Sequence, residues 1–353
     1  MGKLTLPFVG MIMAELAQVG LIILSKQVMA KGMSSFIFIF YSNSLASLIL
    51  LPSSFFIHRF NRPPITFSTI IGCFFLGLLG QFDFFLLDHL ELIVWIEFFN
   101  YSSATLSTAM LNLVPGFTFV LAVLFRLEQF DWKNSSSVAK SLGTIVSIAG
   151  AFIATLYKGP AILMGLSPAN SSLQPLSSQD PNWILGGLFL ALDCVMASAF
   201  LIVQAYVLKK YPAEFIVVFF YCFFVAIQSA VICLVVERDI DAWSLEPMQR
   251  LLTVLYSAVF GSVFQVGVAT WCLHQTGPVF VCMFKPVGII ISVVIGVVFL
   301  GDAFYLGSLV GATVIVVGFY SVLWGKARDI EQVSLESRGK QTPLLKENNI
   351  EEI

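Results

Sequence analysis

Long apolar runs separated by short polar connections dominate this chain. A helix needs about 20 mostly apolar residues to cross the hydrocarbon core of a bilayer. Because a backbone inside lipid must satisfy its own hydrogen bonds, we expect each run of this length to form a helix. The run 68–87 is long enough but contains Asp83. The other runs meet the requirement cleanly, and they are 4–25, 36–57, 104–125, 138–157, 183–207, 215–236, 251–273, 278–300 and 303–324.

The composition also indicates a membrane protein. Of the 353 residues, 58% are apolar and 11% are charged, whereas soluble domains have roughly 45–50% apolar and about 25% charged residues. The net charge of −2 gives no sign of a nucleic-acid partner. All six cysteines fall in apolar runs without ligand spacing, which favours packing over a disulfide or metal role. The sequence contains no nucleophile–base pair, phosphate loop or cofactor fingerprint, so we expect neither an enzyme nor a bound cofactor.

The Lys and Arg residues predict the orientation. If the N-terminus is cytosolic, most Lys and Arg residues fall on the cytosolic side, as the positive-inside rule requires. Both termini are therefore predicted to be cytosolic, and the 158–182 loop lies on the other side with a glycosylation sequon at Asn170. The first run continues to Leu24 without a clear cleavage site, so we interpret it as a retained span. The polar tail 326–353 is expected to be disordered.

An internal repeat is visible in the two halves of the chain. In each copy a proline opens an apolar helix, a short turn with an acid follows, and the next apolar helix has two glycines seven residues apart. Five spans per copy is an odd number, so the copies insert with opposite topology, as in many secondary transporters. The marker residues are Pro115, Glu128, Gly143 and Gly150 in the first copy, and Pro286, Asp302, Gly311 and Gly318 in the second.

Several long stretches of this sequence resemble one family. The chain is similar to the plant drug/metabolite transporters of the Walls-Are-Thin-related group, which are EamA-type proteins also described as amino acids moving in and out transporters. The resemblance covers most of 1–328. The matching stretches are 101–119, 139–151, 156–160, 264–278, 283–286, 299–302 and the segment from there through 324–326.

The resemblance implies an all-α membrane fold of ten transmembrane helices, arranged as two inverted five-helix EamA-type repeats. It places the first half at 1–157 and the second half at 183–325, with the non-cytosolic loop 158–182 between them and the tail 326–353 after them. It also implies transport of amino acids or related metabolites such as auxin.

One segment, 81–100, departs from this family pattern. It is longer than in the family and carries four acids, each of which is costly inside a span. Our hypothesis is a mis-spliced or intron-derived replacement of the end of the third span, and the alternative is an amphipathic interfacial segment. The acids are Asp83, Asp88, Glu91 and Glu97.

Polar residues inside spans are the candidates for solute binding, because they are costly there and usually face a cavity. Glu15 and Gln18 lie three apart and share a helix face. The Glu15 carboxylate would bind a substrate amine or carry a coupling proton, and the alternative is a structural hydrogen bond. Asn112, Pro115 and Thr118 have the same spacing. Pro115 frees a backbone carbonyl that can line a polar pocket, and the alternative is a packing kink.

Lys285 lies inside a span, and it would either bind a substrate carboxylate or extend its ammonium to the interface. Gln204, Gln265 and Trp271 are weaker candidates, with helix bridging or packing as the alternative. Gly143 with Ser147, and Gly307 with Gly311, indicate close helix packing. The predicted substrate-binding residues are Glu15, Gln18, Asn112, Pro115, Thr118, Gln204, Gln265, Trp271 and Lys285.

The sequence therefore predicts a carrier of small organic solutes that works by alternating access between two helix-bundle halves. An amino acid fits a site with one acid, Glu15, and one base, Lys285. The alternatives are a carrier for auxin or another organic anion, and, in a different class, a non-transporting scaffold or inactive splice product. The expected partners are the solute and the lipid bilayer, in the plasma membrane, with the vacuolar membrane as the alternative. Substrate identity, direction, ion coupling and oligomeric state stay open.

Overall fold

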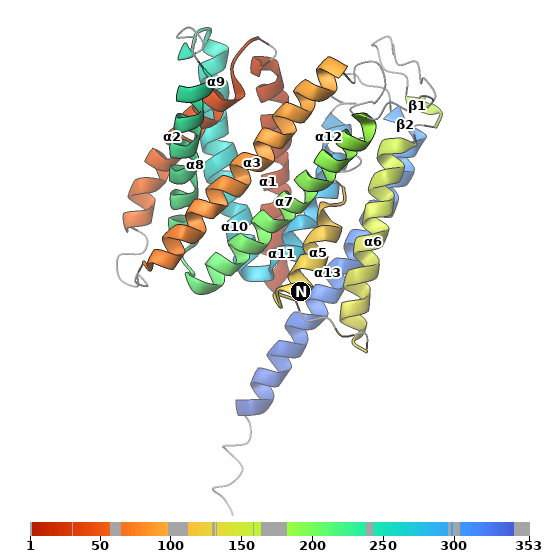
Figure 1. The fold of residues 1–353 in the computed structure, drawn as a ribbon. Coiled ribbons are helices and arrows are strands. Elements are labelled where there is room, and N and C mark those ends of the chain that lie inside the picture. The colour runs from red at the N-terminus through yellow and green to blue at the C-terminus, as the bar shows by residue number, and fades with distance from the viewer. Residues whose placement is uncertain are drawn as a thin grey trace, which may run out of the picture.

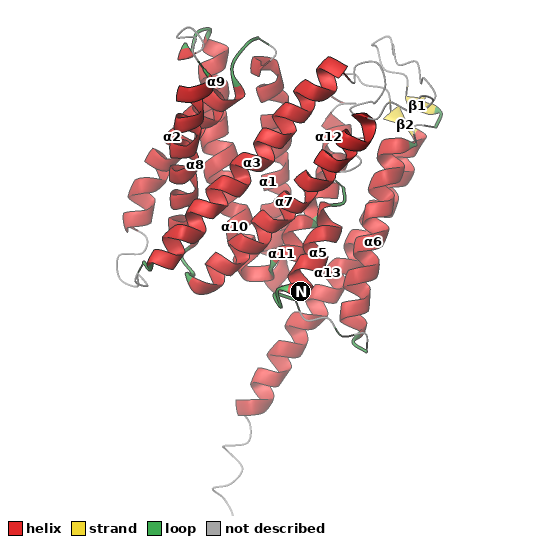
Figure 2. Cartoon of the chain, viewed as in Figure 1, coloured by secondary structure: helices red, strands yellow, loops and turns green. Residues whose placement is uncertain are grey.

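A computed structural model describes the following residues: 2–29, 31–56, 65–97, 112–128, 131, 133–157, 159–163, 182–237, 243–295, 298 and 304–341. Its helices stand side by side in one bundle (Figure 1). Helix is the dominant secondary structure throughout the described part (Figure 2). Eight of the helices described are long and apolar enough to cross a membrane, and two shorter apolar helices cover Phe67–Phe82 and Val114–Leu124.

The elements of the first part of the chain follow the predicted spans. They are α1 (Gly2–Met29), α2 (Ser35–Phe56), α3 (Phe67–Glu97), α5 (Val114–Leu124), α6 (Ser135–Leu156) and the short strand β1 (Ala161–Leu163). Asn134 begins α6, because its side-chain oxygen accepts a hydrogen bond from the Ser136 amide at 3.1 Å. The predicted run 104–125 is described only from residue 112 onward.

The second part of the chain contains two spans built from several pieces. Met248–Thr276 is one continuous span made of α9 (Met248–Tyr256), a π-helix η2 (Ser257–Gln265) and α10 (Val266–Thr276). Gly277 then adopts a positive φ of 87°, which ends α10 and is easiest for glycine. The remaining elements are α7 (Asn182–Lys210), α8 (Glu214–Val236), α11 (Pro278–Cys282), α12 (Phe284–Ile295), β2 (Phe304–Tyr305) and α13 (Leu306–Gln341).

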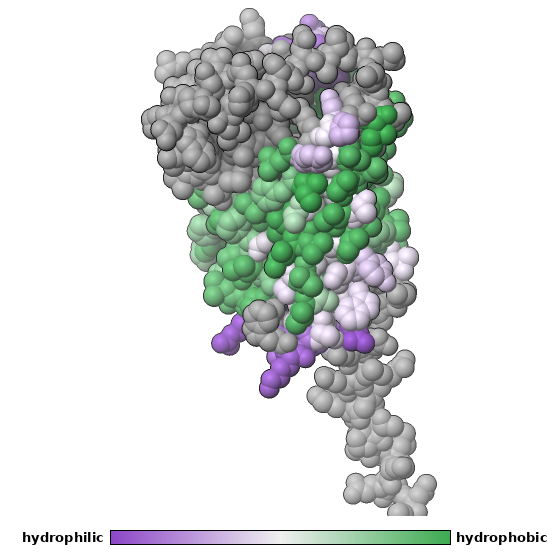
Figure 3. All heavy atoms as spheres, turned by 90° about the vertical axis from the view of Figure 1, so that its right-hand side faces the viewer, coloured by the Kyte–Doolittle hydropathy of each residue, from purple (hydrophilic) through white to green (hydrophobic). Residues whose placement is uncertain are grey.

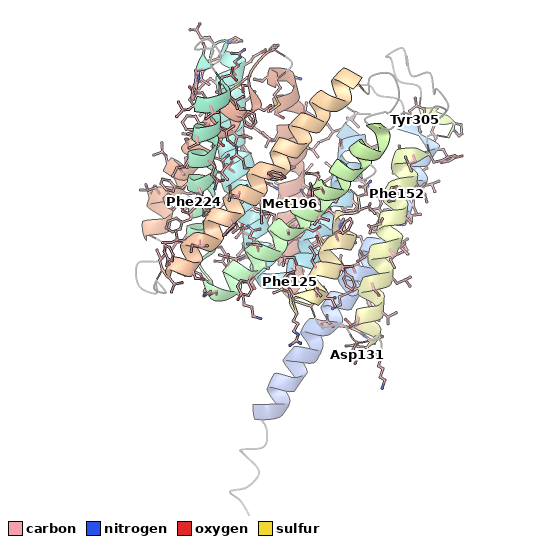
Figure 4. All side chains as sticks on the ribbon, viewed as in Figure 1. Phe125, Asp131, Phe152, Met196, Phe224 and Tyr305 are labelled. Atoms are coloured by element: carbon pink, nitrogen blue, oxygen red, sulfur yellow. The ribbon has the colours of Figure 1, made fainter. Side chains whose placement is uncertain are left out.

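The two ends of the bundle can be told apart by their elements. α1 begins and α13 leaves the bundle at the same end, which we call the terminal end (Figure 1). Phe125 and Asp131 also lie there, whereas Tyr305 lies at the other end, which we call the opposite end (Figure 4). At the opposite end β1 pairs antiparallel with β2, with Ala161 facing Tyr305. This ribbon ties the segment after α6 to the segment before α13.

Helices α6 and α13 pack closely along their length. A Cβ atom added to Gly143 would lie 2.6 Å from the Gly318 carbonyl oxygen, and one added to Gly311 would lie 2.4 Å from the Ala154 amide nitrogen. The backbones are therefore in direct contact, which requires small residues at these positions. This confirms the predicted packing role of Gly143, Ser147 and Gly311.

The outer face of this helix pair is apolar. Figure 3 shows mostly hydrophobic residues on this side, with paler residues among them and strongly hydrophilic residues at the lower edge. Ile145 is 63% exposed on α6 and Val317 is 59% exposed on α13. Exposed apolar side chains over a whole helical face are expected where the surrounding solvent is lipid.

Two segments, the tail from Lys326 and the stretch 81–100, are helical where the structure describes them. The tail from Lys326 was expected to be disordered, but α13 continues as helix to Gln341. Residues 326–341 contain no proline, and contacts of Lys326 and Asp329 with the rest of the bundle hold the first turn of this extension. The atypical segment 81–100 continues α3 as helix to Glu97, which gives α3 31 residues. The side chains after Phe82 lie outside those that the structure describes.

Candidate solute site

Glu15 is an acidic side chain buried inside the bundle. It lies 13 residues after Gly2, which is about 20 Å along α1 and thus deep in a membrane-sized bundle. Only 5% of the residue is exposed. A Cβ atom added to Gly288 would lie 2.8 Å from the Glu15 Oε2 atom, so α12 approaches the carboxylate closely. Within the described part of the chain, no hydrogen bond or ion pair engages this carboxylate.

Lys285 supplies the positive charge that faces this region. It precedes Gly288 by three residues and therefore shares a face of α12 with it. Its ammonium lies within electrostatic range of the Glu15 carboxylate, although the two groups do not form a direct ion pair. The Lys285 side chain is exposed. The fold thus brings one acid and one base together at the interface between α1 and α12.

Three further candidates lie on α1 or on elements that pack against it. Gln18 is half-buried one turn after Glu15 on α1. Gln265 is half-buried at the end of η2, where η2 passes into α10. Trp271 on α10 is also half-buried and lies against α1, since a Cβ atom added to Gly10 would be 4.0 Å from its ring. Gln265 and Trp271 come from elements that contact α1, with Trp271 at the level of Gly10.

Asn112, Pro115 and Thr118 form a second group on and just before α5. All three are buried. Next to Pro115, the Val114 carbonyl accepts a hydrogen bond from the Ser198 hydroxyl of α7 at 3.2 Å. The Thr118 hydroxyl lies against the Cys282 thiol of α11. This group therefore meets α7 and α11, and α11 leads directly along the chain into α12, which carries Lys285.

Gln204 is engaged between two helices. It is 4% exposed, and its Nε2 atom donates a hydrogen bond to the Thr270 hydroxyl of α10 at 2.8 Å. Thr270 in turn donates to the Val266 carbonyl at 2.6 Å. The Gln204 amide thus bridges α7 and α10, which corresponds to the helix-bridging alternative for this residue.

We expect Gln204→Leu to lower the free energy of unfolding by about 1 kcal/mol, because one buried hydrogen bond is lost. The solute concentration that gives half-maximal flux should stay unchanged. Thermal unfolding of the purified protein and a flux titration would measure the two effects. A change of several-fold in that concentration would instead place Gln204 in contact with the solute.

Sequence reasoning missed a buried ionic network at the terminal end. The Lys140 Nζ atom lies 3.1 Å from a Glu128 oxygen and 2.6 Å from an Asp329 oxygen, and Lys326 forms a further ion pair with Glu128. Only 2% of the Lys140 side chain is exposed. The network joins the turn after α5 to α6 and α13. The sequence does show charged residues near the ends of three spans. In the sequence analysis they served only to predict which side of the membrane each span end faces.

The described residues include no group of three or more His, Cys, Asp or Glu side chains arranged to hold a metal ion. What the arrangement offers chemically is binding. A carboxylate and an ammonium in range of one another, with amides and an indole ring nearby, match the charged groups of a small zwitterion.

Comparison with known proteins gives a consistent result. The EamA-like transporter family matches residues 184–324. The WAT1-related protein At3g28050 of Arabidopsis thaliana is 45% identical over 335 residues, which cover 94% of this chain and 89% of the relative. The WAT1-related protein At5g40240 of the same plant is 40% identical over 352 residues, which cover 98% of this chain and 93% of the relative.

One solved crystal structure has a similar fold. Its TM-score is 0.62 at 14% sequence identity, and the alignment covers 91% of this chain and 98% of the solved chain. At that identity the likeness concerns the fold alone. The apolar helices and the sequence relatives together indicate a multi-pass membrane protein of a transporter family.

Proposed function

Because this chain belongs to the WAT1-related group of EamA-type membrane transporters, we propose that it carries amino acids or closely related small metabolites across its membrane. Its relatives are transporter-family proteins rather than enzymes, and nothing in the comparisons supports the alternative of a non-transporting scaffold.

The proposed substrate class rests on the burial of the Glu15 carboxylate and on its lack of a hydrogen-bond partner among the described residues. A buried carboxylate in a span is costly unless it meets a partner. Among the described residues no hydrogen bond satisfies it, and Lys285 acts on it only from a distance. A bound amino acid satisfies both groups at once, because its ammonium faces Glu15 and its carboxylate faces Lys285. Gln18, Gln265 and Trp271 would line the same site.

We further propose ten spans in two inverted halves, 1–157 and 183–325. The eight long helices and the two shorter apolar helices support this number. The glycines support the inversion. Gly143 approaches the Gly318 carbonyl and Gly150 approaches the Gly311 carbonyl. In the repeat, Gly143 corresponds to Gly311 and Gly150 to Gly318, and such an exchange of contacts is what a two-fold axis between the halves produces.

The terminal end is proposed to face the cytosol. Exposed basic residues at that end include Arg126, Lys133, Lys209 and Lys210. The described part of the opposite end carries Lys31 and Arg250. This asymmetry follows the positive-inside rule. It leaves the 158–182 loop on the other side, with the plasma membrane as the proposed location and the vacuolar membrane as the alternative.

Flux of labelled amino acids into proteoliposomes tests the proposal. We expect Glu15→Gln and Lys285→Met each to reduce the initial rate at least tenfold, because each removes one charge that binds the solute. Gln275→Ala, an exposed polar change at the end of α10, serves as the matched control and should leave the rate unchanged. Unchanged flux in both charge variants would remove the two-charge site. Loss with Lys285→Met alone, together with transport of auxin, would favour an organic-anion carrier.

A further inference from the structure

Four aromatic rings from four helices meet on the terminal side of Glu15. We call Phe8, Phe280, Phe284 and Phe319 the aromatic cluster. The ring centroids of Phe8 and Phe284 are 5.8 Å apart, those of Phe8 and Phe319 are 6.0 Å apart, and those of Phe284 and Phe319 are 4.9 Å apart. Phe280 extends the cluster, with its centroid 5.2 Å from that of Phe284. The contacts are mostly edge-to-face, which is a favourable aromatic geometry.

The cluster lies directly below the candidate site along the same helix interface. Phe8 precedes Glu15 by seven residues, so it lies on the same face of α1 and about 10 Å nearer the terminal end. Phe284 precedes Gly288 by four residues and shares a face of α12 with it. Glu15 meets α12 at Gly288, and Phe8 meets α12 at Phe284. The interface between α1 and α12 therefore has a charged layer and, on its terminal side, an aromatic layer.

Further packing closes the terminal side of the cluster. Phe280 and Phe284 are at most 1% exposed and Phe319 is 8% exposed. Lys326 follows Phe319 by two helical turns on α13 and pairs with Glu128 beside the Gly277 turn. The same apolar core includes buried residues of α3, α5, α7 and α8. Three of the four rings are therefore buried on the terminal side of the charged layer, and Phe8 is half-buried.

The helices that carry the cluster are interrupted next to it. α11 is a five-residue helix, with the Gly277 turn on one side and a break at Met283 on the other. Residues at the ends of short elements are where a transporter absorbs changes in backbone direction. Phe280 and Phe284 stand on either side of the Met283 break, so a change there would move these rings relative to Phe8 and Phe319.

We propose that the aromatic cluster is the gate between the solute site and the terminal end, and that this structure shows the gate closed. The inference rests on the proposed function, since a gate serves a solute that passes Glu15. Opening requires Phe8 to separate from Phe284 and Phe319. In the proposed orientation the gate faces the cytosol.

Thiol labelling from each side of the membrane tests the gate without any solute. A Glu15→Cys variant places a thiol at the charged layer, and the six native cysteines give little background because all are buried. In oriented vesicles, a charged, membrane-impermeant thiol reagent should label Cys-bearing protein at least tenfold faster from the opposite end than from the terminal end. Adding Phe8→Ala should raise the labelling rate from the terminal end at least tenfold.

Two further variants make the result specific. Phe125→Ala removes an exposed ring at the terminal end, outside the cluster, and should leave labelling unchanged (Figure 4). Phe8→Leu keeps apolar bulk and should give an intermediate rate even if Phe8→Ala fails to fold. The gate is disproved if the terminal-end rate is already fast before the Phe8 change, if it stays unchanged in the folded Phe8 variants, or if neither side labels the thiol.

The labelling result separates the gate from the transport proposal. If the labelling follows the expected pattern and no amino acid or organic anion moves in the flux assay, the barrier stands and the proposed function fails. If solutes move but the Phe8 variants do not change labelling, the proposed function stands and the gate assignment fails.

Discussion

Replacing Lys140 by methionine should lower the free energy of unfolding by about 3–5 kcal/mol, because it removes a buried cation that pairs with the buried Glu128 and the partly exposed Asp329. Lys140 is 2% exposed and bonds to both Glu128 and Asp329. Lys326 compensates only part of the lost charge, since it pairs with Glu128 and not with Asp329. The thermal unfolding midpoint of the detergent-purified protein, followed by tryptophan fluorescence, would measure the loss.

Lys133→Met is the matched control for this prediction. Lys133 lies at the same end of the bundle, but its side chain is exposed. Surface charges of this kind contribute roughly 0–1 kcal/mol. Adding Asp329→Asn to Lys140→Met should recover part of the stability, because it removes the carboxylate that has lost its cation. Equal midpoints for the Lys140 and Lys133 variants would show that the network contributes nothing to stability.

Gly318→Leu should have the second largest effect, with a loss of about 3 kcal/mol from overpacking. A Cβ atom at this position would lie 2.4 Å from the Ser147 amide nitrogen and 2.6 Å from the Gly143 carbonyl oxygen. Both neighbours are backbone atoms in α6 and cannot rotate away, so the two helices have to separate. Size-exclusion chromatography after mild heating should show a smaller monodisperse fraction than for the unaltered protein.

Gly267→Ala provides the corresponding control within the same protein. Gly267 is also a helical glycine, but a Cβ atom there would meet nothing within 4 Å. Alanine is the better helix former by about 1 kcal/mol, so this variant should be as stable as the unaltered protein or slightly more stable. If Gly318→Leu matched Gly267→Ala in the heating assay, the close contact between α6 and α13 would not matter for the fold.

Much of the fold follows from local sequence. Lipid demands that each spanning backbone satisfies its own hydrogen bonds, so the length of an apolar run alone determines a helix. The runs at 36–57 and 215–236 correspond to α2 and α8 within a few residues. The spacing of Gly143 and Ser147 likewise indicates a close helix contact, because small residues on one face have few other uses in a membrane.

Local sequence did not reveal the partners of those residues. Gly143 meets Gly318 across 175 positions of chain, and Glu128 finds Lys326 across 198. Burial and apolar composition are the same whichever helix lies next to a span, so no local pattern selects the neighbour. The helix at 326–341 was not predicted for the same reason. Its polar residues resemble those of a disordered tail, and only the tertiary structure shows that Asp329 pairs with Lys140.

The candidate site divides in the same way. Sequence alone determined which residues are unusual, because a charge inside a span is costly wherever it stands, and this singled out Glu15 and Lys285. Only the tertiary structure decided that these two share the interface between α1 and α12, that Gln204 is bound to Thr270, and that aromatic rings pack together on one side. The physical reason is that the free-energy cost of a charge inside a span depends on the residue and the surrounding lipid. Which side chains lie close together depends on how helices far apart in the sequence pack.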